Sequence, residues 1–128
     1  MAGFITDEAF DAGLDYLIAN GSRVDIVDTA EPTTYSLATV SGTNSDGNKT
    51  GLTLSATADG PSDGRKTIIP AITDGSVTFT DTAGFWALTD ATSLLLATGP
   101  LTGSQAVTSG NTFSLDAIEL RFRDATAV

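Results

Sequence analysis

The chain of 128 residues contains no histidine and no cysteine, and its 16 acidic and 6 basic side chains give a formal net charge of −10. These absences exclude His-based catalytic triads, Cys nucleophiles, thiolate metal sites and disulfide bonds. The negative charge argues against general binding to nucleic acid and to anionic membranes, because both carry phosphate groups that would repel it. The length suits a single domain over residues 1–128.

The N-terminal segment predicts a helix over residues 7–19, the only one that the pattern supports. Thr6 is a suitable N-cap, and two acidic residues follow it, where the helix dipole favours negative charge. Four apolar side chains then recur at helical spacing as one stripe: Phe10, Leu14, Leu17 and Ile18. We expect this stripe to pack on a sheet. The alternative is docking on a neighbouring subunit, which makes Phe10 and Leu14 candidate subunit contacts.

From residue 22 to residue 123 the chain shows the period-two alternation of β-strands, with turn residues roughly every ten positions. Thr and Ser make up a quarter of the chain and favour a pleated, half-exposed surface. The pattern predicts a mainly β fold, an antiparallel β-sandwich or barrel of about seven to nine short strands behind one N-terminal α-helix. The first strands are expected at residues 23–28, 35–41, 52–56, 67–72, 77–80, 85–89 and 94–98, with polar loops at 42–50 and 59–64.

Three local signals refine this arrangement. Pro70 cannot donate a backbone hydrogen bond, so its strand is expected at an edge or with a bulge. The pair Asp74-Gly75 is typical of a turn and predicts a hairpin. In the last strand region, residues 112–122, the apolar phase slips near Asp116, which predicts a bulge or a bend.

The catalytic chemistries that remain are a carboxylate pair, as in glycosidases, and a Ser–Lys dyad. The acidic residues fall mainly in turns and at strand ends, where an Asp side chain bonds its own backbone. The two lysines, Lys49 and Lys66, lie beside Gly- and Asp-rich loops and are expected in solvent. We therefore predict a protein that is not an enzyme, with no catalytic residues and no cofactor.

One loop partly matches a calcium-binding pattern, with Asp59 and Asp63 at the first and fifth positions and Gly64 at the sixth. Pro61 and Pro70 occupy the third and twelfth positions, where the EF-hand pattern needs oxygen ligands, so the pattern fails. We interpret these acidic side chains as turn residues and predict no metal site. A loose surface calcium site is the alternative.

Two further features allow both a structural and a functional interpretation. Trp86, beside Phe85 in an apolar strand, is expected in the core, and the alternative is a platform for a ligand. Arg121 and Arg123 alternate with Phe122 near the C-terminus. They predict either an exposed strand face or ion-pair contacts with a neighbouring subunit, which makes both arginines candidate contact residues.

Several segments of the chain are similar to a known family. They are AITDGSV at 71–77, FWALTD at 85–90, LLLATG at 94–99 and LTGSQAVTSGNTF at 101–113, with AEPTTY at 30–35 and GRK at 64–66 upstream. Together they resemble a family of small proteins encoded in the structural gene clusters of tailed bacteriophages, and the resemblance spans nearly the whole chain. The shared motifs are of the packing and turn type, so the resemblance brings no catalytic residues to this chain.

The resemblance implies a virion component. The role that fits best is a capsid decoration (cement) protein, which binds the major capsid protein or other virion proteins and strengthens the head lattice. Such a protein is expected to be a homo-oligomer, with a trimer favoured, and to lie in the head of the phage particle. The alternatives are a tail, neck or fibre component, and a β-sandwich module that binds a host surface or a sugar through Trp86 or the loop at 42–50.

Overall fold

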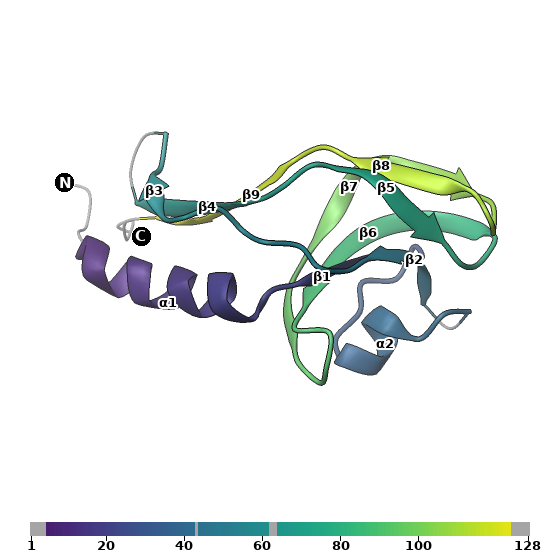
Figure 1. Ribbon diagram of the computed structural model, residues 1–128, viewed down its shortest axis with the longest axis horizontal. Helices are drawn as coiled ribbons and strands as arrows, with labels where there is room; N and C mark the ends of the chain where they lie inside the picture. The colour runs from purple at the N-terminus through teal and green to yellow at the C-terminus, as the bar shows by residue number, and fades with distance from the viewer. Residues whose placement is uncertain (1–4, 43, 62–63, 124–128) are drawn as a thin grey trace.

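The computed structural model describes residues 5–42, 44–61 and 64–123, and within them nine strands form two antiparallel sheets. The mainly β fold class predicted from the sequence is therefore confirmed. One long helix, α1 (Asp7–Asn20), precedes the strands and occupies one end of an elongated molecule (Figure 1). No helix in this part of the chain is long and apolar enough to cross a bilayer.

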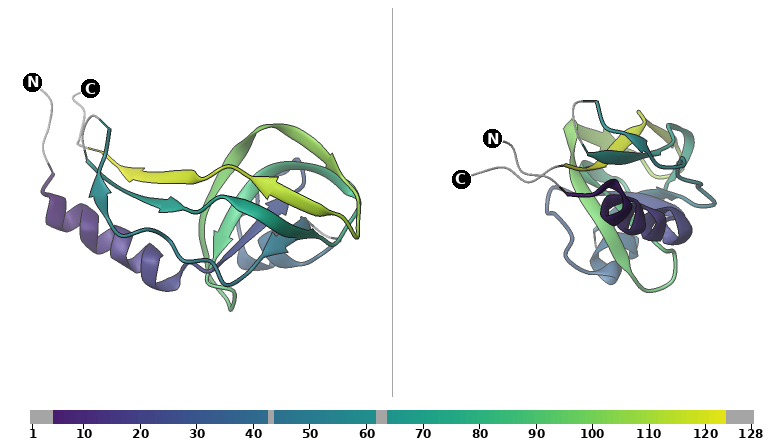
Figure 2. Two further views of the ribbon diagram at one scale, coloured as in Figure 1. Left: turned by 45° about the horizontal axis from the view of Figure 1, so that its top comes forward. Right: turned by 90° about the vertical axis from the view of Figure 1, so that its left-hand side faces the viewer.

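The larger sheet has six strands in the order β7-β6-β1-β2-β5-β8, and it curls into a half-barrel (Figure 2). Its strands are β1 (Arg23–Val27), β2 (Ser45–Lys49), β5 (Ile72–Val77), β6 (Asp81–Thr89), β7 (Leu95–Val107) and β8 (Thr112–Leu115). Because β7 and β8 stand at the two ends of this order, their outer edges pair with no other described strand. The half-barrel is therefore open between these two edges.

The smaller sheet has the order β3-β4-β9 and consists of β3 (Ala58–Asp59), β4 (Arg65–Ile69) and β9 (Ile118–Phe122). Helix α1 packs on one of its faces, where the ring centroids of Phe10 and Phe122 are 6.0 Å apart. A Cβ atom at Gly13 would come within 2.4 Å of the same Phe122 ring, so the helix lies tightly against the sheet. The helix predicted at 7–19 and the packing of its stripe on a sheet are thus confirmed.

A long two-stranded ribbon joins the two sheets, because β4 continues into β5 and β8 continues into β9 (Figure 1). Ile69 pairs with Ile118 on one side of the junction, and Ile72 pairs with Leu115 on the other. Two residues separate these pairs on each strand, so neither strand has an extra residue and the register is the same on both sides. The ribbon therefore holds the small sheet and the half-barrel in one continuous frame.

Pairing is interrupted at the junction, where residues 70–71 face residues 116–117. Pro70 has no N–H to donate, which explains why the ladder breaks here. The predicted edge strand or bulge is wrong, because β4 and β5 each have neighbours on both sides and the register across the junction is unchanged. The phase slip near Asp116 is a bend, since the unchanged register leaves no extra residue for a bulge.

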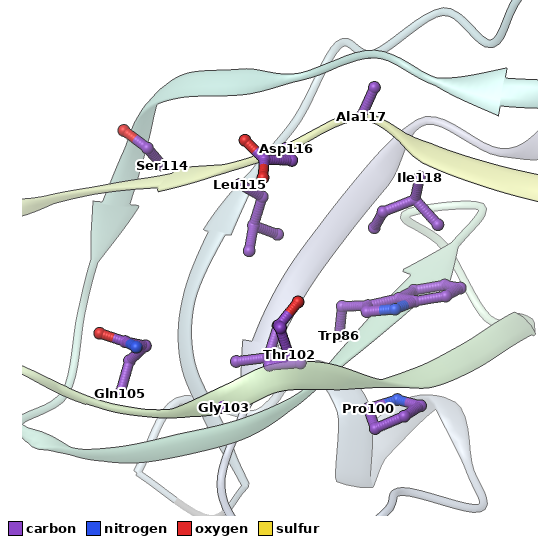
Figure 3. A pocket seen from close by; sticks show the side chains of 11 residues that line it. Trp86, Pro100, Thr102, Gly103, Gln105, Ser114, Leu115, Asp116, Ala117 and Ile118 are labelled. Carbon is purple, nitrogen blue, oxygen red and sulfur yellow. The ribbon is translucent and has the colours of Figure 1, made fainter.

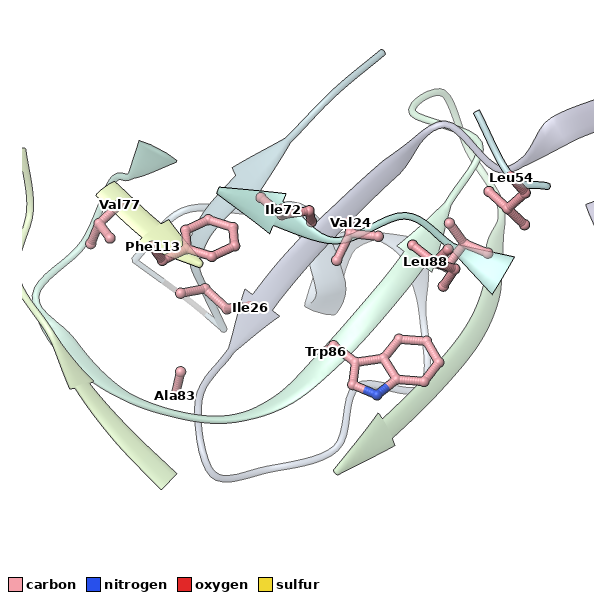
Figure 4. Packing of buried hydrophobic residues seen from close by; sticks show 10 residues of the cluster. Val24, Ile26, Leu54, Ile72, Val77, Ala83, Trp86, Leu88 and Phe113 are labelled. Atoms are coloured by element: carbon pink, nitrogen blue, oxygen red, sulfur yellow. The ribbon is translucent and has the colours of Figure 1, made fainter. Parts of the chain in front are cut away.

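The main core lies on the inner face of the curled sheet (Figure 4). Alternation along β1 sends Val24 and Ile26 to this face, while Asp25 and Val27 point to the outer face. The buried inner cluster consists of Val24, Ile26, Leu54, Ile69, Ile72, Val77, Ala83, Trp86, Leu88 and Phe113. The alternation of strand residues between two faces therefore accounts for the inward direction of Val24 and Ile26.

The segment 42–50, predicted as a polar loop, contains β2 in the middle of the larger sheet. β2 pairs with both β1 and β5, so its polar backbone groups are satisfied by two neighbours. A Cβ atom at Gly47 would lie 2.5 Å from the backbone oxygen of Ser76, and glycine permits this close approach. The loop prediction is wrong because these tertiary contacts override the weak strand propensity of the segment.

Four other local predictions are also wrong. Of the strand predicted at 77–80, only Val77 lies in a strand, as the last residue of β5. Residues 35–41 form a short helix, α2 (Tyr35–Thr39), instead of a strand, because the Thr34 hydroxyl caps it by accepting the Leu37 N–H at 3.2 Å. Residues 52–56 lie outside any strand, although their Leu54 reaches the core. The pair at residues 74–75 lies inside β5 and forms no hairpin turn.

Candidate functional site

A cavity of about 350 Å³ opens between the two free edges of the half-barrel (Figure 3). Its floor includes Trp86 from β6, and one wall is formed by residues 100–105 of β7. The opposite wall is formed by residues 114–118, at the junction of β8 and β9. The cavity therefore lies where the sheet fails to close.

The register of β7 is irregular where this strand lines the opening. Phe85 pairs with Pro100 and Ala83 pairs with Gln105, so Gly84 alone on β6 stands opposite four residues of β7. The extra residues form a bulge, and bulges of this kind re-aim an edge strand. Three of these four residues, Leu101, Thr102 and Gly103, line the cavity.

Trp86 belongs to the core, as the sequence analysis favoured, and only 8% of it is exposed. Its indole lies flat against the backbone of β7, because a Cβ atom at Gly99 would come within 2.7 Å of the ring. The same side chain also contributes to the cavity lining. Trp86 thus supports the core and borders the cavity, with most of its surface already covered by the chain.

A network of polar side chains lies on the outer face of the half-barrel, close to α2. Arg23 donates two hydrogen bonds to the Asp25 carboxylate, at 2.7 and 2.9 Å, and one to the backbone oxygen of Thr39 at 3.2 Å. The Ser45 hydroxyl donates to Asp25 at 2.6 Å. Burial raises the pKa of Asp25, and the hydrogen bonds from Arg23 and Ser45 oppose that rise. This network ties the end of α2 to two central strands.

The neighbouring Asp46 has no such partners. It is 1% exposed, and its Oδ2 atom has no hydrogen bond within the described part of the chain. Burial raises its pKa to about 6, and repulsion from Asp81 and Asp28 adds to the rise.

Among the described residues, no group of three or more acidic, His or Cys side chains is arranged to hold a metal ion.

The candidate subunit contacts fall into two classes. Phe10 is 6% exposed and Leu14 is fully buried, so the chain itself covers both side chains. Arg121 and Arg123 lie on the surface at the end of β9. The arginines can reach a neighbouring molecule without a change in the fold, whereas the two helix residues lie beneath the surface.

The outer face of the small sheet carries a cluster of charges. Lys66 on β4 lies directly opposite Arg121 on β9, and both approach the Glu119 carboxylate, at 3.9 and 3.1 Å. This face points away from α1, because the alternate residues Arg65 and Phe122 face the helix. Two cations share one carboxylate here, so the face is locally basic.

The other predicted ligands and bases are engaged in ion pairs. Asp59 accepts from Arg65 at 2.6 Å, and the same guanidinium binds Asp11 at 2.8 Å. Lys49 pairs with Asp74 at 2.9 Å. Asp63 of the calcium-like loop lies outside the described residues.

Sequence reasoning missed the cavity and the Asp25 network. The alternation Arg23-x-Asp25 in a strand places both side chains on one face and was a usable signal for the network. The cavity had no local signal, because it depends on which strands fail to pair. No protein-family model, no curated protein and no solved structure matches this chain.

Proposed function

We propose that this protein is a non-enzymatic structural component of a tailed-phage virion, and within it a capsid decoration protein that binds the major capsid protein and stabilises the head lattice. The similarity of its segments to small structural phage proteins supports the virion role. The structural observation that carries the proposal is the basic outer face of the small sheet, which is directed away from the helix and the core (Figure 2).

This face differs in charge from the rest of the chain. Lys66 and Arg121 outnumber Glu119 there, while the whole chain has a net charge of −10. A basic face on an acidic protein complements the acidic surface of the next copy, and such head-to-tail contacts form a ring when the rotation between copies closes. The charge distribution therefore supports a homo-oligomer, and the three-fold positions of a capsid lattice favour a trimer.

The composition of the particle tests this function. Quantitative protein analysis of purified virions is expected to find this chain at a copy number comparable to that of the major capsid protein. Heads that lack the chain are expected to lose DNA at lower temperature, because a decoration layer adds buried contact area between capsid subunits.

The copy number also separates the proposal from its alternative. A copy number that matches a single ring of the neck or tail would contradict a decoration role and favour a tail or neck component. Absence of the chain from purified virions would contradict the virion role altogether.

A further inference from the structure

Two strand edges without partners border the cavity. β7 and β8 are the terminal strands of the larger sheet, and neither pairs with the other within the described residues. An edge strand directs half of its backbone N–H and C=O groups away from its own sheet. The cavity therefore lies between two rows of backbone donors and acceptors, which is the environment that an added strand requires.

We call the cavity between β7 and the β8–β9 junction the slot. The side chains that line it form an apolar floor with a polar rim. Leu115 and Ile118 point across the slot toward the side of Trp86 (Figure 3). Gln105 and Asp116 lie at the exposed rim. An extended peptide has apolar and polar side chains on alternate faces, so one face of it matches the floor and the other faces solvent.

The charge of the slot selects among possible peptides. Asp116 is the only charged residue in the lining of this cavity, and the chain as a whole carries a net charge of −10. A basic segment would therefore be attracted to the slot, whereas an acidic segment would be repelled.

We propose that this slot binds an extended, positively charged segment of a partner protein, which adds as a strand between β7 and β8 and closes the half-barrel. The inference goes beyond the proposed function, because it names a binding mode and a class of ligand that do not depend on the location of the protein in a particle. Backbone hydrogen bonds hold the segment, and the apolar floor sets which of its side chains point inward.

Trp86 allows a direct test, because it is the only tryptophan of the chain and borders the slot. The full chain is titrated with end-capped peptides of about eight residues. In the Lys peptides, Val, Leu or Phe alternates with Lys. The matched Glu peptides have the same sequences with Glu in place of each Lys. We expect the Lys peptides to shift the Trp86 emission saturably, and the Glu peptides to bind at least roughly tenfold more weakly.

A backbone-modified peptide separates strand addition from simple charge attraction. N-methylation of alternate residues removes the N–H groups that would pair with β7 or β8, while the side chains and the charge stay the same. We expect this modification to weaken binding by roughly tenfold or more, because several backbone hydrogen bonds to β7 or β8 are lost together.

Two variants with the same change in charge locate the site. Thr102→Arg fills the rim of the slot, whereas Thr53→Arg adds the same charge at an exposed position outside it. We expect Thr102→Arg to weaken binding of the Lys peptide by roughly tenfold or more and Thr53→Arg to change it by less than about threefold. Circular dichroism of both variants checks that the fold is retained.

The proposal is overturned if no Lys peptide shifts the Trp86 emission up to about 1 mM, the weak limit of specific binding. Equal binding of the N-methylated peptide would also overturn it, because the attraction would then need no backbone pairing. An emission shift with chitotriose or maltotriose, and none with the peptides, would identify the slot as a sugar site instead.

Discussion

At the residue scale, the Oδ2 atom of Asp46 is a buried side-chain oxygen without a hydrogen bond in the described part of the chain. Ile26 pairs with Gly47 and Val27 pairs with Ser45, so Asp46 is the extra residue of a bulge in β2. The bulge turns the Asp46 side chain into a buried position near Asp28 and Asp81, both of which raise its pKa. Burial raises the pKa of both Asp46 and Asp25 on the next strand, but only Asp25 has hydrogen bonds from Arg23 and Ser45 that oppose the rise.

The raised pKa of Asp46 predicts a pH-dependent stability. Between its ordinary pKa of 3.8 and the folded-state value of about 6, the folded chain binds the proton more tightly than the unfolded chain. The contribution of this residue to the free energy of unfolding therefore falls as the pH rises from about 4 to about 6. Asp46→Asn removes the charge, and we expect it to raise the free energy of unfolding at pH 7 by about 1–2 kcal/mol.

Urea unfolding at several pH values measures this effect. The control is Asp15→Asn on the exposed surface of α1, which is expected to leave the pH dependence between about 4 and 6 unchanged. If Asp46→Asn and the parent protein lose stability in parallel over this range, the titration of Asp46 does not contribute to it.

Gly99 is the second position where one residue decides a local structure. A Cβ atom there would lie 2.7 Å from the indole of Trp86, and the ring is enclosed in the core. We expect Gly99→Ala to lower the free energy of unfolding by about 1–3 kcal/mol, because the ring has to move in a packed environment. Gly103→Ala, four residues along the same strand, is the matched control, since its Cβ meets no atom within 4 Å.

Thermal unfolding of both glycine variants is the measurement. Equal melting temperatures for Gly99→Ala and Gly103→Ala would contradict the close contact between Trp86 and β7.

At the element scale, β4 and β9 combine a buried face with a charged one. Residues that face α1 include Arg65, which binds Asp11, and Phe122, which packs on Phe10. The next pair along the two strands, Lys66 and Arg121, points to the opposite face. The alternation of a two-stranded ribbon thus produces the surface on which the proposed oligomer depends.

Reversing one charge on this face tests that surface. Arg121→Glu leaves Lys66 facing two carboxylates and makes the face acidic. If the face contacts the acidic surface of another copy, the association constant is expected to fall by roughly tenfold or more, measured by sedimentation. Lys49→Glu on the half-barrel makes the same change in charge away from this face and serves as the control.

A result in which both variants associate like the parent protein would exclude the small-sheet face as an oligomer contact. A monomeric parent protein at all concentrations would exclude the homo-oligomer itself.

At the scale of the whole molecule, the two sheets share one frame. The β4–β5 and β8–β9 ribbon keeps a single register across the junction, and Leu17 and Ile18 of α1 pack against the main core cluster. These connections predict that the helix end and the half-barrel unfold together as one domain.

Leu14→Ala tests this cooperativity, because Leu14 is fully buried on α1. We expect a loss of about 2–5 kcal/mol in the free energy of unfolding. Hydrogen exchange is expected to show the same loss of protection in β1 and β6 as in α1 and β4. Loss of protection confined to α1 and the small sheet would mean that the two ends of the molecule unfold separately.

The parts of this fold that were predicted correctly have strong local patterns. The stripe of α1 and the alternation of Val24 and Ile26 each act through the chain immediately around them. Errors occurred where tertiary contacts compete with local propensity, as in β2, whose polar residues pair with strands on both sides. In α2, the Thr34 cap and the burial of Ala38 outweigh the apparent strand pattern.

The amino-acid sequence alone determined the mainly β class, the N-terminal helix and the absence of histidine and cysteine chemistry, because periodicity and composition are properties of the chain itself. Only the tertiary structure decided that the larger sheet stays open between β7 and β8 and that Asp46 is buried without a partner. Both depend on which distant strands pair and in what register. The slot beside Trp86 and the basic face of the small sheet follow from that pairing, and no short segment of the sequence contains either of them.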